Sequence, residues 1–134
     1  MRDIITEYIN ALKNDGDLQS ILGGPYVYAA YIPQPPVVPS ITIKRNSETA
    51  QPRLGQSLYG YLDYKPMCEV HVWCSTNTLD IDDIAARVVS LTFQSSFIPG
   101  TREWRLVSGP AIQWEEDRQL YHLSMRFQCV YTDC

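Results

Sequence analysis

Two segments of the chain place apolar residues at the spacing of a helix. The first runs from about residue 3 to residue 14, with Asp3 as its capping residue. The second runs from about residue 81 to residue 96, and the acidic residues around its start favour the positive end of a helix. A short turn capped by Asp17 follows the first helix and ends before Gly23. The predicted core faces contain Ile4, Ile5, Tyr8, Ile9, Leu12, Ile81, Ile84, Ala85, Val88, Leu91 and Thr92.

Alternation of apolar and polar residues predicts strands in most of the remaining chain. The prolines of residues 33–39 form an extended connector, because proline cannot donate a ladder hydrogen bond. The order of elements predicts an α+β fold with an antiparallel or mixed sheet of about five to six strands, and two main helices packed on one face. The length favours one domain over residues 1–134. The predicted strands span residues 26–32, 40–45, 67–74, 102–108, 111–116 and 119–131.

The strand over residues 67–74 contains a Cys-x-x-His-x-x-Cys spacing, which suggests a metal site. Neighbouring positions on a strand alternate between faces, so Cys68 and Cys74 point one way and His71 points the other. A tetrahedral zinc site needs ligands that converge. We therefore predict no metal, two core thiols and a half-exposed His71. The same parity places His122 on the solvent face of the last strand, away from Cys129 in the core.

The remaining patterns predict neither an enzyme nor a cofactor. The acidic residues at 80–83 lack the glycine and the final glutamate of a calcium loop, and residues 115–117 form a solvated turn. The sequence contains no nucleophile elbow, Walker loop or dinucleotide fingerprint. A net charge of −4 argues against bulk binding to nucleic acid or anionic membranes. No apolar run approaches the roughly 20 residues that span a bilayer.

The long polar segment over residues 46–66 is the strongest candidate for an interaction site. A loop of this length in a compact domain is usually functional or disordered. It is rich in tyrosine and locally basic, and residues 58–64 alternate like one arm of a projecting hairpin. Tyrosine and arginine are common anchors of protein–protein contacts. The predicted subunit or partner interface consists of Arg45, Arg53, Leu58, Tyr59, Tyr61, Tyr64 and Lys65.

Over nearly its whole length the chain resembles the small tail-terminator, or tail-completion, proteins of long-tailed bacteriophages and gene-transfer particles. The first feature is an N-terminal helix leading to residues 18–28 and a proline-rich step before residues 39–43. The second is the strand over residues 69–75, which ends in an aromatic and a small residue and is followed by the helix at residues 81–89. The third is the long closing strand over residues 121–131.

The resemblance implies a non-enzymatic ring, usually a hexamer, seated on the last ring of a tail tube. Such a ring stops tube growth and presents a surface to the head–tail connector, while genomic DNA passes through its lumen without specific binding. It implies a place at the head-proximal end of a virion tail, after assembly in the cytoplasm of a bacterial host. It implies no membrane partner.

Two other readings of the sequence stay open. The first is a head-completion or connector-ring protein, which belongs to a neighbouring structural class. The second is a small ligand-binding or enzymatic α+β domain that uses a cleft beside His71. A large cyclic oligomer in solution favours the ring readings, and a strict monomer with a bound metal favours the last one.

Overall fold

A computed structural model describes residues 3–33, 37–52, 62–75, 79–94 and 97–133 of the chain. Three helices and five strands make up this part of the structure. The helices are α1 (Ile4–Lys13), α2 (Gly16–Leu22) and α3 (Leu79–Thr92). The strands are β1 (Val27–Ala29), β2 (Ser40–Pro52), β3 (Leu62–Cys74), β4 (Thr101–Glu115) and β5 (Leu120–Asp133).

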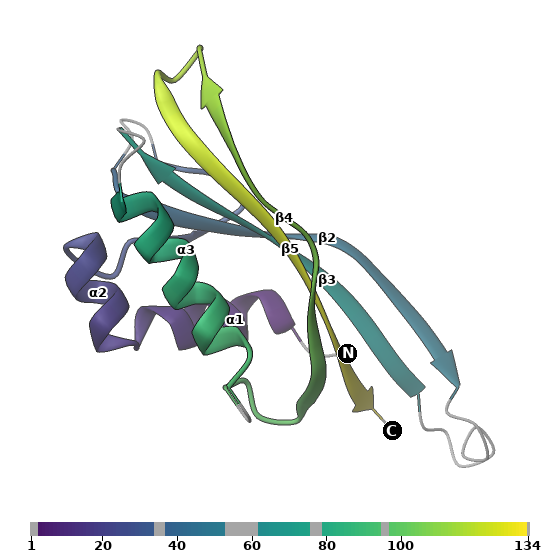
Figure 1. The fold of residues 1–134 in the computed structure, drawn as a ribbon. Coiled ribbons are helices and arrows are strands. Elements are labelled where there is room, and N and C mark those ends of the chain that lie inside the picture. The colour runs from purple at the N-terminus through teal and green to yellow at the C-terminus, as the bar shows by residue number, and fades with distance from the viewer. Residues whose placement is uncertain (1–2, 34–36, 53–61, 76–78, 95–96, 134) are drawn as a thin grey trace.

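The strands form one mixed sheet in the order β1-β2-β3-β5-β4. β1 runs parallel to β2, and the other neighbours are antiparallel. The three helices lie on one side of this sheet, and its other side carries no helix among the described residues (Figure 1). The predicted α+β class, with a mixed sheet and helices on one face, is therefore confirmed. Among the described residues, no helix combines the length and apolarity needed to cross a membrane.

The core lies between the helices and the face of the sheet that they cover. Tyr8 of α1 is fully buried, and its ring meets the edges of Phe97 and Trp104 at 6.4 and 5.4 Å between centroids. Its hydroxyl bonds to the Thr92 hydroxyl, which donates to the Val88 carbonyl at 2.7 Å. Burial raises the pKa of Tyr8 far above its usual value, so this phenol stays neutral. A buried polar group is therefore paired within an apolar core, as the cost of desolvation requires.

The N-terminus of α2 is capped by Asp15, so the prediction that Asp17 caps this turn is wrong. The helix begins two residues earlier than a cap at Asp17 implies, at Gly16. The Asp15 carboxylate therefore accepts from the Leu18 backbone N–H at 2.9 Å. Arg87 of α3 donates to both oxygens of the same carboxylate at 2.8 and 3.0 Å, which lowers the pKa of Asp15. One carboxylate thus caps α2 and ties it to α3.

Several predicted strand boundaries differ from the structure. The first predicted strand shortens to β1, because Ala30 turns the chain with a φ of 63°. The segment over residues 46–66 is not irregular at its ends, since β2 and β3 pair as far as Pro52 and Leu62. The two strands predicted over residues 102–116 are one strand, β4, whose register against β5 shifts three times. Such bulges absorb extra residues without ending a strand.

Gly109, at one of these shifts, is expected to tolerate no side chain. Its φ is +85°, and an added Cβ would collide with the Ser124 carbonyl and lie 3.1 Å from Met125 Cα. Gly109→Ala is therefore expected to reduce the free energy of unfolding by at least about 1 kcal/mol, measured by denaturant titration. Gly16→Ala is the matched control: nothing lies within 4 Å of its added Cβ, so no loss of stability is expected. An equal loss in both variants contradicts this account of Gly109.

Candidate functional site

The structure describes only some of the predicted interface residues, and those lie at different places in the fold. Arg53, Leu58, Tyr59 and Tyr61 lie outside the described residues. Arg45 is exposed on β2. The ring of Tyr64 stacks on Tyr131 at 5.1 Å between centroids, so this tyrosine covers the rim of the core. Its neighbour Lys65 is half-buried and lines a hollow of about 170 Å³ with side chains of β4 and β5. The described members of this set therefore do not form one contact patch, and their role in an interface stays a prediction.

Strand β4 forms one edge of the sheet and exposes apolar side chains that the sequence reading did not select. Val107, Ile112 and Trp114 are 42%, 41% and 46% exposed. Ile112 lies opposite the buried Leu123 and Trp114 lies opposite Tyr121, so both continue the helix-covered face to the edge. The β4–β5 turn projects beyond the helices (Figure 1). Ile112 and Trp114 thus form an apolar stripe along an edge strand. Unpaired backbone groups at such an edge favour the addition of another chain.

The opposite edge of the sheet is built differently. The short strand β1 pairs with β2 only at Ile41, Thr42 and Ile43. Within the described residues, no strand pairs with the remaining part of β2 on the side away from β3. The β2–β3 pair continues past the helices, toward the segment that joins the two strands (Figure 1). The sheet therefore has two unlike edges that are open to pairing.

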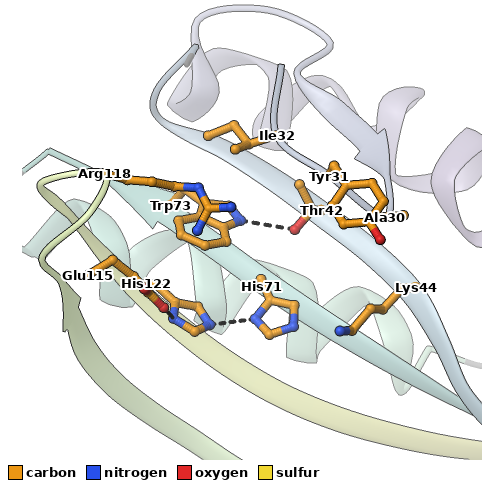
Figure 2. Close-up of a pocket in the computed structure, with 10 residues that line it drawn as sticks. All are labelled: Ala30, Tyr31, Ile32, Thr42, Lys44, His71, Trp73, Glu115, Arg118 and His122. Carbon is orange, nitrogen blue, oxygen red and sulfur yellow. Dashed lines mark hydrogen bonds and ion pairs between the residues drawn. The ribbon is translucent and has the colours of Figure 1, made fainter. Parts of the chain in front are cut away.

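A cleft with a volume of about 200 Å³ lies on the face of the sheet that points away from the core. Trp73 and the two histidines of the chain form part of its lining. The segment after β1 and the β4–β5 turn border it on opposite sides (Figure 2). The lining residues are Ala30, Tyr31, Ile32, Thr42, Lys44, His71, Trp73, Glu115, Arg118 and His122.

Four titratable side chains run in a row across this face. Nε2 of His71 lies 2.9 Å from Oε1 of Glu69. Its other ring nitrogen, Nδ1, lies 2.5 Å from Nε2 of His122 (Figure 2). Nδ1 of His122 lies 3.1 Å from Oε1 of Glu115, at an angle that makes this an ion-pair contact and not an aligned hydrogen bond. The result is a carboxylate–imidazole–imidazole–carboxylate row drawn from β3, β5 and β4.

Trp73 fixes the position of His122 within this row. The indole N–H of Trp73 donates to the Thr42 hydroxyl at 2.9 Å. Its ring stacks on the His122 ring at 4.6 Å between centroids with an interplanar angle of 13°. The guanidinium carbon of Arg118 lies 5.3 Å from the centroid of the Trp73 ring, a cation–π contact from the β4–β5 turn (Figure 2).

The surroundings favour neutral imidazoles and an ionised Glu69 carboxylate. Burial lowers the pKa of His71, and His122 lowers it further, while Glu69 acts in the opposite direction. Burial also lowers the pKa of His122, against the influence of Glu115. Burial opposes ionisation of Glu69, but the Asn46 amide, at 2.7 Å, and His71 hold its pKa below the usual value. Both rings are therefore neutral at neutral pH.

The predicted solvent-facing position of His122 is wrong, because this residue is only 8% exposed. Alternation along the strand placed it correctly on the face away from the core, but Trp73 stacks on its ring there, and Arg118 lies over Trp73 in turn. Its meeting with His71 was also missed: His122 pairs in register with Trp73, so His71 is its diagonal neighbour. Only the register of β3 against β5 reveals this contact.

The prediction that the cysteines of β3 and β5 lie on the core face of the sheet is confirmed. Cys68, Cys74 and Cys129 carry thiols that are buried on the core side and form no disulfide, away from His71. Burial raises the pKa of Cys74 to about 11, so its thiol stays protonated. Within the described part of the chain, no group of three or more histidine, cysteine, aspartate or glutamate side chains is placed to hold a metal ion.

Comparison with known proteins places the fold. No protein-family model and no curated protein sequence matches the chain. Among solved structures, the chain is similar to a chain of the virion of a native gene transfer agent (GTA) particle, with a TM-score of 0.66 and 13% sequence identity. The match covers 94% of this chain and 92% of that chain. At this identity the likeness establishes a shared fold.

Proposed function

We propose that this protein is a non-enzymatic assembly protein of a phage-like particle, of the tail-terminator type. It forms a ring, a hexamer by resemblance, that caps the tail tube, stops its elongation and joins the tail to the head. The observation that carries the proposal is the fold shared with a chain of a gene transfer agent virion over 94% of the present chain. Its partners are further copies of itself, a tail tube protein and a head–tail connector protein, with genomic DNA passing through the lumen.

The open sheet supplies a way to close such a ring. β4 and the free part of β2 are different surfaces on opposite edges of the sheet. A contact between unlike surfaces is heterologous, and it generates a ring when the rotation that relates successive copies closes. The apolar stripe of Ile112 and Trp114 gives the β4 edge side-chain contacts beyond its backbone hydrogen bonds. We place β4 of one copy against the β2 edge of the next.

The segment joining β2 to β3 is the second contact surface in this proposal. Its arms end at the paired residues Pro52 and Leu62. Replacing residues 53–61 by Asn-Gly, a turn suited to a two-residue hairpin connection, is expected to leave a folded monomer that no longer forms rings or docks on tubes. The measurement is the mass of the assembly by light scattering, with circular dichroism to verify folding.

A second variant separates the effect of the side chains of residues 53–61 from the effect of the length of this segment. It replaces residues 53–61 with a glycine–serine segment that has the same number of residues. Because this variant keeps the reach of the segment but loses its tyrosines and Arg53, it is expected to fail in the same way. Normal assembly of both variants would show that this segment is not a contact surface.

A further inference from the structure

The row from Glu69 to Glu115 contains three close contacts, but its two neutral imidazoles carry only two ring N–H protons. Glu69 meets His71, the two rings meet each other, and His122 meets Glu115. An imidazole–carboxylate contact and an imidazole–imidazole contact each need one proton between the two heavy atoms. A neutral imidazole carries only one ring proton. Two neutral rings therefore leave one of the three contacts without a proton.

The geometry identifies the unfilled contact. Nε2 of His71 is aligned with Glu69, and Nδ1 of the same ring is aligned with His122. Nδ1 of His122 is buried and has no aligned hydrogen bond, although Glu115 lies 3.1 Å away. When the two aligned contacts hold the two imidazole protons, this nitrogen is bare and its lone pair faces the Glu115 carboxylate, so the two groups repel. One additional proton on His122 converts that repulsion into a charge-assisted hydrogen bond.

We propose that His71 and His122 form a site for one shared proton, which binds as the pH falls below neutral, and that this site excludes a second proton. After the first proton binds, each of the three contacts contains one proton and both carboxylates face an N–H group. A second proton would place two N–H groups against each other across the 2.5 Å gap between the rings. It would also put two positive charges side by side in a partly buried site.

The charges around the pair set the affinity for that proton. Glu69 on β3 and Glu115 on β4 favour it. Lys44 on β2 and Arg118 in the β4–β5 turn oppose it, and Arg126 on β5 lies 3.8 Å from the Glu69 carboxylate. The segment after β1 lines the cleft with Ala30, Tyr31 and Ile32, none of which is an acidic or basic residue. With neutral rings, three positive groups thus surround two carboxylates, and proton binding adds one further positive charge.

The sign of the effect on stability follows from burial. Burial lowers the pKa of both histidines below the ordinary value of 6.5, so the unfolded chain takes up protons at a higher pH than the folded chain. Stability from the neutral pair is complete above that value and decreases as the pH falls through it. The site thus responds in the mildly acidic range that is typical of histidine switches.

Histidine NMR tests the proposal directly, because these two residues are the only histidines of the chain. Untagged protein with labelled imidazole rings is titrated from about pH 8 to about pH 4. The expected result is one proton gained by the pair in the first step, with the resonances of both rings shifting together, and a separate second step at lower pH. Two independent steps, each adding a full proton to one ring near pH 6.5, would overturn the proposal.

His122→Gln provides the control for coupling, since glutamine keeps a polar side chain beside Trp73. Loss of the neighbouring ring is expected to raise the pKa of His71, because His122 lowers it in the native chain. An unchanged His71 titration would show that no proton is shared. Equilibrium dialysis against zinc chloride at neutral pH tests the other cation that two imidazoles bind; stoichiometric zinc uptake would overturn the assignment to a proton.

Discussion

A chain carrying both Ile112→Lys and Trp114→Glu is expected to fold normally and to lose ring assembly. Both side chains are more than two-fifths exposed, so the free energy of unfolding should change by no more than about 1 kcal/mol. Charged side chains in their place would have to be desolvated, without partners, in the contact between neighbouring copies. Assembly mass by light scattering or native mass spectrometry, and a denaturant titration, measure the two effects separately.

The matched control uses the same two charges on the other face of the same strand. Ala111→Lys and Gln113→Glu alter exposed positions that lie opposite Ser124 and His122. Because these positions are not part of the apolar stripe, this chain is expected to assemble. Assembly by the Ile112/Trp114 variant, or loss of assembly in both, would contradict the assignment of the contact to the stripe.

The helices and the core were predictable because they depend on local periodicity. The apolar stripe of residues 4–12 reappears as the buried face of α1, and Ile81, Ile84 and Val88 as that of α3. Parity along one strand was equally sufficient to separate Cys68 and Cys74 from His71. Each of these features involves neighbours within one element, so no knowledge of the partner strand was required.

The features that the sequence did not disclose depend on pairing between distant strands. The ladder from Ser47 to Pro52 is mostly polar and contains proline, so its pattern resembled a loop until the β3 partner was known. His122 looked solvent-exposed because Trp73, which stacks on its ring, comes from another strand. The β4 stripe was missed for the opposite reason: Ile112 and Trp114 alternate like core residues, but both stay more than two-fifths exposed on the edge strand.

The length of the tails in particles that lack this protein distinguishes a tail terminator from a head-completion or connector ring. A tail terminator controls the length of the tube, so its absence changes tail length. A head-completion or connector ring acts on the head, so its absence leaves tails of normal length that lack heads. The fold shared with a gene transfer agent virion chain is compatible with either type of ring. Tail length is therefore the quantity that decides between them.

The most direct test is negative-stain microscopy of the phage-like particles made by the host after deletion of this gene. We expect over-long tails detached from heads, and plasmid-borne native protein should restore tails of uniform length joined to heads. The Ile112→Lys/Trp114→Glu chain should fail to restore them, while the Ala111→Lys/Gln113→Glu chain succeeds. Tails of normal length in the deletion strain, with or without attached heads, would contradict the proposed function.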